Sequence, residues 1–245
     1  MGQRYQVSNG IVIRRYELPN GDLIATLYGE NGKWRGMAKK GKRLGGNLGK
    51  LSLFHDVTVQ HYRRGEDDLS IITQVQLNGA LPKLSDPAVY AYAHLLAELL
   101  DKLTADAHMG EDMYSYFASG LRGLSQHSDP DAVAMVYTWK LLQQAGLSPR
   151  VSSCALCNAN EVSTKFDVTA GGLTCASCNA GINLTLDTVH DLQNIHTQTV
   201  RQVLEAPLSE RALHWNLLNR YMSYHIGDLR SLGSVRQLSL EGAAT

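Results

Sequence analysis

Cysteine is scarce in this chain, and its placement narrows the chemistry more than its number does. The 245 residues contain four cysteines, which form two Cys-x-x-Cys pairs, Cys154 with Cys157 and Cys175 with Cys178, with 17 residues between the pairs. That spacing is typical of two knuckles that close one tetrahedral zinc site. Four thiolates leave no position for water or substrate, so the pattern predicts one structural Zn²⁺ ion rather than a catalytic one.

Other signals are absent as well. No apolar run approaches the ~18 residues that a membrane helix needs, and the chain has neither a Gly-x-Ser-x-Gly nor a His-Glu-x-x-His motif. The nine histidines are scattered, and we expect His94 and His190 to be surface or packing residues because neither has a cysteine or carboxylate partner at metal spacing. The sequence therefore predicts no catalytic residue and no membrane association. The absence of a secretory signal favours the cytoplasm.

Two other interpretations of the cysteines are less favoured. Two disulfides would need an oxidising compartment. A redox Cys-x-x-Cys would be expected once, near the start of a helix in a βαβ unit. Asn158 and Asn179 follow the two pairs, and Asn tolerates the left-handed backbone at which a knuckle turns. Gly171-Gly172 is expected to form a tight corner before the second pair.

Net charge is zero, because 23 Lys and Arg balance 23 Asp and Glu. The balance is uneven along the chain: residues 1–65 contain twelve basic and four acidic side chains, whereas the other 180 contain 11 and 19. A basic first quarter on an acidic body favours a surface for a polyanion at one end of the protein. The alternative is a solvated charged face without a ligand.

The first 80 residues have the pattern of short strands joined by turns. Turn signals occur at Pro19-Asn20-Gly21-Asp22 and at Asn31-Gly32. The expected strands cover residues 10–16, 22–28, 33–40, 51–62 and 69–77. Five short strands in this length predict a small closed barrel of the OB type, with an SH3-like barrel as the structural alternative.

After residue 85 the apolar residues recur at helical spacing. Asp86-Pro87 and Asp129-Pro130 have the form of a cap followed by a first-turn proline. The expected helices cover residues 86–103, 111–125, 129–146, 187–204 and 209–225, and the polar tail after 227 is expected to be poorly ordered at its end. We therefore predict an α+β protein: an OB-type nucleic-acid-binding domain at 1–80, then an α-helical domain at 81–245 with a four-cysteine zinc ribbon inserted at 150–181.

The third expected strand carries the clearest cationic row. Lys33, Arg35 and Lys39 occupy odd positions, so their side chains share one side of the strand. Trp34 lies on the other side and is expected in the core, as is Phe54. Further candidate nucleic-acid-binding cations are Lys40, Lys42 and Arg43 in the glycine-rich loop and Arg14 and Arg15 in the first strand, and Lys50, Arg63 and Arg64 could extend the footprint. Binding through phosphates predicts a steep salt dependence and weak sequence preference.

Five stretches in this order resemble the RecO family of bacterial recombination mediators. The stretches are Gly10-Ile11-Val12-Ile13-Arg14-Arg15, Gly32-Lys33-Trp34-Arg35-Gly36-Met37-Ala38-Lys39-Lys40-Gly41, Leu53-Phe54-His55, Lys140-Leu141-Leu142-Gln143-Gln144-Ala145-Gly146-Leu147-Ser148-Pro149 and Gly171-Gly172-Leu173-Thr174-Cys175. The resemblance covers most of the chain. No single stretch is unique to the family, but their order is specific.

The resemblance implies a DNA-binding mediator rather than an enzyme. RecO proteins bind single- and double-stranded DNA, anneal complementary strands and, with RecR, help to place RecA on DNA covered by single-strand-binding protein. It thus implies DNA, RecR and single-strand-binding protein as partners, RecF and RecA as further candidates, and a cytoplasmic, nucleoid-associated location. The family's DNA-contacting cations map most directly onto Arg35 and Lys39, and more loosely onto Lys33, Lys40, Lys42 and Arg43. The family's zinc ligands map onto the four cysteines, where the metal stabilises the fold.

Two other functions stay open at this point. An RNA-binding barrel with a zinc ribbon would have the same charge pattern but would distinguish RNA through its 2′-hydroxyl. A zinc enzyme is the third interpretation, and it is disfavoured because a closed thiolate site has no open coordination position.

Overall fold

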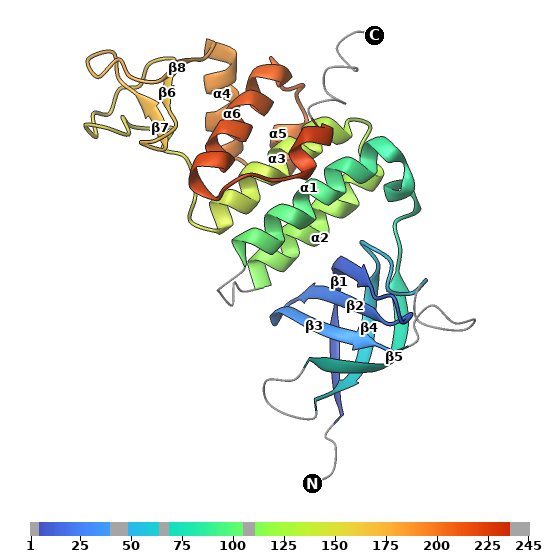
Figure 1. The fold of residues 1–245 in the computed structure, drawn as a ribbon. Helices are drawn as coiled ribbons and strands as arrows, with labels where there is room; N and C mark the ends of the chain where they lie inside the picture. Colours follow the sequence, from blue (N-terminus) through green and yellow to red (C-terminus); the bar gives the residue numbers. More distant parts are fainter. Residues whose placement is uncertain (1–4, 40–48, 64–68, 105–110, 236–245) are drawn as a thin grey trace.

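The computed structural model describes residues 5–39, 49–63, 69–104 and 111–235. In Figure 1 a β-barrel lies at one end, a bundle of helices in the middle and a small sheet at the far end. The predicted α+β architecture is confirmed, with the barrel first and the helical region and its four cysteines after it. Within the described residues, no helix has the combination of length and apolarity that crossing a bilayer would require.

Five strands form the closed barrel. They are β1 (Gln6–Glu17), β2 (Leu23–Gly29), β3 (Gly32–Ala38), β4 (Asp56–Tyr62) and β5 (Ser70–Gly79). They close in the order β1-β2-β3-β5-β4, with β4 back on β1 and a parallel β3–β5 pair. This order is that of the OB type and not of the SH3-like alternative. Leu23, Leu27, Val57 and Val59 alternate toward the interior and are fully buried there.

The fourth strand begins later than the sequence pattern predicted. Residues 51–55 were expected in it, but β4 starts at Asp56. Phe54 adopts a left-handed backbone with φ of 65°, and the His55 N–H bonds to the Ser52 carbonyl at 3.2 Å, so the chain turns there. The Phe54 ring is buried outside the barrel, against the helices. The alternation of apolar residues therefore did not indicate a strand here but a turn, in which Leu51 is buried in the barrel and Phe54 against the helices.

Seven helical segments follow. They are η1 (Pro82–Ser85), α1 (Pro87–Leu103), α2 (Glu111–Gln126), α3 (Pro130–Gln144), α4 (Leu186–Thr197), α5 (Val200–Leu204) and α6 (Arg211–His225). The predicted caps of α1 and α3 are present, since the Asp86 and Asp129 carboxylates accept from Ala88 N–H and Ala132 N–H. The prediction of one helix over 187–204 is wrong, because Thr199 begins a new helix with a capping box to Gln202.

The barrel and the helices share one apolar core. Ile11, Ile13 and Tyr28 point outward from the barrel and join the buried cluster of the helices. α1 packs against β1 and α2 against β2. Across the same junction the Lys33 ammonium bonds to the Asp101 carboxylate at 2.8 Å and to the Asp101 carbonyl at 2.9 Å. The barrel is therefore held on α1 by both packing and an ion pair.

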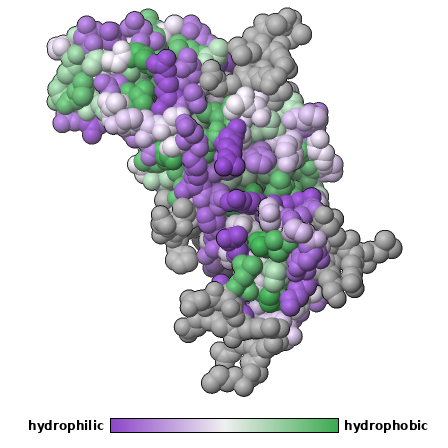
Figure 2. Space-filling model, in the orientation of Figure 1, coloured by the Kyte–Doolittle hydropathy of each residue, from purple (hydrophilic) through white to green (hydrophobic). Residues whose placement is uncertain are grey.

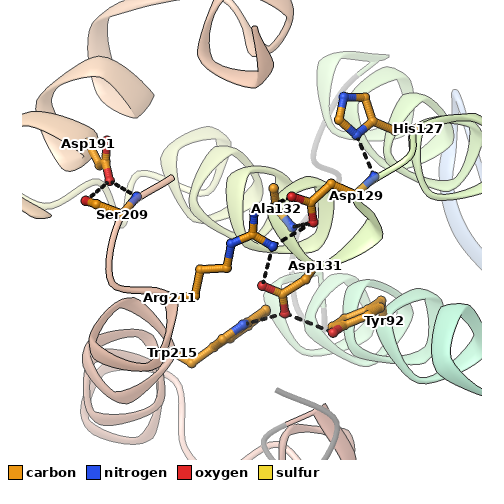
Figure 3. Close-up of polar contacts among 9 residues, drawn as sticks. All are labelled: Tyr92, His127, Asp129, Asp131, Ala132, Asp191, Ser209, Arg211 and Trp215. Carbon is orange, nitrogen blue, oxygen red and sulfur yellow. Dashed lines mark hydrogen bonds and ion pairs between the residues drawn. The ribbon is translucent and has the colours of Figure 1, made fainter. Parts of the chain in front are cut away.

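A polar network joins α6 to α1 and α3 (Figure 3). Arg211 bonds to Asp129 and approaches Asp131 at 3.6 Å. Asp131 also accepts from the Trp215 indole and the Tyr92 hydroxyl, each at 2.8 Å. Because all of these groups are partly or fully buried, their hydrogen bonds fix the angle at which the last long helix meets the others.

A small sheet carries the cysteines between α3 and α4. Its strands are β6 (Lys165–Asp167), β7 (Gly172–Thr174) and β8 (Ile182–Asn183). The Phe166 ring packs edge-on against Tyr221 of α6, with ring centroids 6.0 Å apart, and His225 of α6 bonds to the Val168 carbonyl at 2.9 Å. The chain after α6 remains packed through residue 235, since Leu229, Leu232 and Val235 are buried. The expectation of poor order concerns the end of the tail, which lies outside the described residues.

Candidate nucleic-acid interface and metal site

The strand register places two arginines in one row on the outer face of the barrel. Arg14 of β1 and Arg35 of β3 both stand opposite Thr26 of β2. Residues directly opposite on antiparallel strands point to the same side of the sheet, so the two arginine side chains share the outer face. Their backbones are separated by two strand spacings, which is about 10 Å. A bulge in β1 between Val12 and Arg14 sets this register. The cationic side predicted for the third strand thus extends onto the first.

Arg35 and Lys39 are both exposed, and among the described residues neither takes part in an ion pair. The next row of the same face carries Tyr16 and Met37 opposite Ile24, and Tyr16 is 62% exposed. Figure 2 shows hydrophobic side chains gathered in a patch on the barrel and hydrophilic ones across its junction with the helices. Free cations beside an exposed aromatic ring can hold a phosphate chain and a base at once.

The other predicted cations differ in their partners. Lys33 is turned toward Asp101, and Arg14 approaches the same carboxylate at 3.6 Å with 74% of its own side chain exposed. Arg15 is half-buried and pairs with Glu17 at 3.3 Å. Lys40, Lys42, Arg43 and Arg64 lie outside the described residues. The structure therefore brings Arg14 and Arg35 together on one face, places Lys39 in the turn directly after β3, and ties Lys33 and Arg15 to carboxylates.

Trp34 and Phe54 are both packed, as expected from their positions. Trp34 is half-buried against the barrel interior and stacks on His61, with ring centroids 4.8 Å apart and an interplanar angle of 19°. Burial, and then the charge of Arg63, lowers the pKa of His61, so this ring is neutral at pH 7. Tyr5 and Tyr62 form an edge-on pair at 5.6 Å on the other side of β1. Tyr16, by contrast, lies on the cationic face.

The cysteines form two matched knuckles. In each, the N–H of the asparagine after the second cysteine bonds to the carbonyl of the first: Asn158 to Cys154 at 3.0 Å and Asn179 to Cys175 at 2.9 Å. Both asparagines have the expected left-handed backbone, with φ of 62° and 48°. The left-handed backbone at Asn158 is one that glycine adopts most easily, and the knuckle forms with asparagine there. Gly171 makes the expected corner at φ of 75°.

The four sulfur atoms suit one tetrahedral ion. All lie within 4.8 Å of one another, and those of Cys157 and Cys175 are 3.6 Å apart. Zn–S bonds of ~2.3 Å in a tetrahedron require sulfurs ~3.8 Å apart. The Cys157 N–H lowers the pKa of the Cys154 thiol to about 6, whereas the neighbouring sulfurs, Cys157 first, raise that of Cys178 to about 12. Such a group cannot hold four thiolates unless a cation balances their charge, so the donor set fits zinc.

Comparison with known proteins covers both halves of the chain. Residues 4–80 match the family model described as Recombination protein O N terminal, and residues 84–233 match Recombination protein O C terminal. DNA repair protein RecO of Exiguobacterium sibiricum is 27% identical over 169 residues, which cover 69% of this chain and 68% of that protein. DNA repair protein RecO of Bacillus mycoides is 27% identical over 175 residues, covering 70% of each.

Proposed function

The chain belongs to the RecO family of DNA repair and recombination proteins, and we propose that it acts as a mediator that anneals complementary single strands. With RecR it would promote the loading of RecA onto DNA coated with single-strand-binding protein. The observation that supports the DNA-binding part is the pair of exposed cations Arg35 and Lys39, which have no carboxylate partner among the described residues, with Arg35 in line with Arg14 on the outer face of the barrel.

Annealing needs no bond to be made or broken. Two DNA strands repel each other through their phosphates, and a cationic surface that holds both lowers the repulsion and releases counterions. Arg14 and Arg35 supply that charge on the sheet, and Lys39 adds to it from the turn after β3. Lys33 is proposed as a further contact only when a phosphate displaces Asp101. Lys40, Lys42 and Arg43 follow β3 in the sequence and extend the proposed footprint.

We propose a division of labour near residue 80. The barrel binds DNA, and the helical region with its zinc ribbon supplies contacts to RecR, single-strand-binding protein and further partners. Cys154, Cys157, Cys175 and Cys178 would hold one Zn²⁺, which balances their charge and joins the two knuckles. No residue is assigned a catalytic role. The ribbon packs on α6 through Phe166, so zinc acts on folding rather than on the DNA surface.

Strand annealing measured with and without RecR tests the proposal. We expect the protein alone to speed the pairing of complementary oligonucleotides, with the rate falling steeply as salt rises. RecR and RecA filament formation on coated DNA test the second part. A competition between DNA and RNA of equal length tests the alternative: a preference for RNA would replace this proposal with the RNA-binding module, because only RNA offers a 2′-hydroxyl.

A further inference from the structure

Two cavities meet between the barrel and α1. One has a volume of about 460 Å³ and the other about 440 Å³, and both are lined by Arg15 and Leu53. β1 and the turn at residues 52–55 form one wall, and α1 forms the other. Because they share Arg15 and Leu53, the two cavities adjoin each other along the junction between the barrel and the helices. We call the two together the junction groove.

Aromatic rings follow one wall of the junction groove. Tyr90 lies 5.6 Å from Phe54 and 5.8 Å from His94, measured between ring centroids. Tyr90 and His94 are one helical turn apart, so they occupy the same face of α1. Phe54 is buried, whereas Tyr90 is 39% exposed and His94 is exposed. Phe54 therefore supports two rings that a ligand in the groove can reach.

Cations line both parts of the groove. Arg15 lines the cavity that contains Tyr90 and Phe54. Arg14, Arg15, Lys102 and Arg230 line the larger cavity together with His94. Its two carboxylates are already engaged. Glu98 accepts from the N–H groups of Arg230 and Ser231 at 3.0 and 2.8 Å and from the Ser231 hydroxyl at 2.6 Å. Asp101 is paired with Lys33 and Arg14.

The protonation of Glu98 agrees with this engagement. Burial acts to raise its pKa, but the hydrogen bonds from Ser231 and from the Arg230 N–H outweigh burial and hold the pKa below its ordinary value. The Glu98 charge is therefore present at pH 7 but directed at donors of its own chain. The guanidinium groups at the rim keep donors available for an anion, because each carries five N–H groups.

We propose that the junction groove binds a short segment of unpaired single-stranded DNA, with a base stacked on Tyr90 and phosphates held by Arg14, Arg15 and Arg230. The assignment rests on the proposed DNA-binding function and names which form of DNA this part of the surface takes. In a duplex each base is stacked and paired, so its face cannot reach Tyr90. Sequence-tolerant stacking on an aromatic ring beside cations is how single strands are held without base readout.

The groove also adjoins the outer face of the barrel. Asp101 contacts both Arg14, at the groove, and Lys33, on β3, so one carboxylate lies between the two surfaces. A strand that leaves the groove past Arg14 reaches Arg35 on the same row of the sheet. Rings selective for unpaired bases thus lie next to cations that accept either form of DNA. An acidic protein segment is the alternative occupant, but its carboxylates would pair with the cations and would not stack on the exposed rings.

Binding of labelled oligothymidylate and of a duplex of equal length, followed by fluorescence anisotropy, tests this assignment in the full chain. Tyr90→Ala and His94→Ala remove the two reachable rings, whereas Tyr90→Phe keeps the ring. Tyr224→Ala is the matched control, since Tyr224 is an exposed tyrosine of α6. We expect Tyr90→Ala to weaken oligothymidylate binding by about fivefold or more and His94→Ala by less, with duplex affinity unchanged.

The outcomes separate this inference from the proposed function. Equal losses for oligothymidylate and duplex in Tyr90→Ala, or no loss in either ring variant, would overturn the single-strand assignment while DNA binding itself stands. If Tyr90→Ala weakens the binding of an acidic peptide but not that of oligothymidylate, the groove belongs to a protein partner and the single-strand assignment is wrong. If the unaltered protein binds neither form of DNA, the proposed function fails first. His94 is exposed, so its variant provides the answer even if Tyr90→Ala folds poorly.

Discussion

The barrel and the four-cysteine ribbon, at opposite ends of the molecule, differ in how their charged groups are arranged. At the barrel end, Arg35 and Lys39 are exposed and have no carboxylate partner among the described residues. At the other end, two knuckles bring four sulfur atoms within 4.8 Å of one another, with Cys154 and Cys175 buried and Cys157 exposed. At the barrel the unpaired cations favour an anionic ligand that binds reversibly. At the ribbon the close thiolates repel one another, which favours a permanently bound cation.

This difference separates function from stability. Loss of Arg35 or Lys39 should leave the packing of the barrel unchanged, because both residues are exposed. Loss of a cysteine would remove one ligand of the proposed zinc ion, and the ribbon has only three short strands to hold it together. Changes at one end should therefore affect DNA binding, and changes at the other should affect unfolding.

The largest expected effect is on the ribbon. Replacing Cys175 and Cys178 with Ser should abolish zinc binding and destabilise the protein by several kcal/mol, since structural zinc contributes on the order of 10 kcal/mol in small zinc domains. Metal analysis should give one zinc per chain before the change and none after, and thermal unfolding should begin at a lower temperature. Asn158→Gly is the matched control, because glycine also adopts φ of 62°. Unaltered stability in a metal-free variant would refute the structural role.

The second effect is at the barrel. Arg35→Glu with Lys39→Glu should weaken DNA binding about 10- to 100-fold at low salt and reduce the slope of log affinity against log salt by about 2. Arg220→Glu, a charge reversal on an exposed residue of α6, should change little. Titrations over a series of salt concentrations measure both quantities. Unchanged affinity together with an unchanged slope would place the DNA elsewhere on the protein.

Elements with local signals could be predicted from the sequence. The asparagines after each cysteine pair predicted left-handed turns because few residues accept that backbone, and both turns are present. Asp86 and Asp129 predicted helix starts because an aspartate before a proline satisfies the first N–H groups, and both caps are present. The barrel followed from alternating strands and glycine turns, with the strand order left for the structure to supply.

Features that depend on distant partners could not be predicted. Lys33 and Asp101 are 68 residues apart, and no pattern within the third strand shows that α1 brings a carboxylate to it. The bulge that aligns Arg14 with Arg35 depends on how β1 pairs with β2, which the sequence of β1 alone does not show. Tyr90 and His94 lie in a helix with ordinary periodicity, and only the placement of α1 beside the turn at Phe54 makes them the wall of a groove.

The third effect concerns the network between the two ends. Asp129→Asn keeps a capping side chain but removes the charge that binds Arg211, so we expect a loss of about 1–2 kcal/mol. Burial acts to raise the Asp129 pKa, but Arg211 and the Ala132 N–H lower it by more. A lowered carboxyl pKa stabilises the fold above the unfolded value of ~3.9, and this stabilisation is lost as pH falls through the lower folded value.

Denaturant unfolding at a series of pH values tests this sign. The difference in unfolding free energy between the unaltered protein and Asp129→Asn should be largest near pH 7 and shrink below pH 4. Asp187→Asn, at an exposed residue in the first turn of α4, is the control and should show a smaller difference. A difference that stays constant down to pH 2 would mean that the Asp129 charge does not contribute through its pKa.

The smallest effect should be a gain. Asp101 neutralises cations that would otherwise face DNA, so Asp101→Asn should raise single-strand affinity about two- to threefold and change stability by less than about 1 kcal/mol, as for other partly exposed ion pairs. Lys33 keeps its bond to the Asp101 carbonyl in this variant, so the charge released is mainly that of Arg14. Arg14→Ala in the same background should cancel the gain. If affinity falls instead, Asp101 positions Arg14 for the phosphate, and the barrel cations depend on the helices for their geometry as well as for their support.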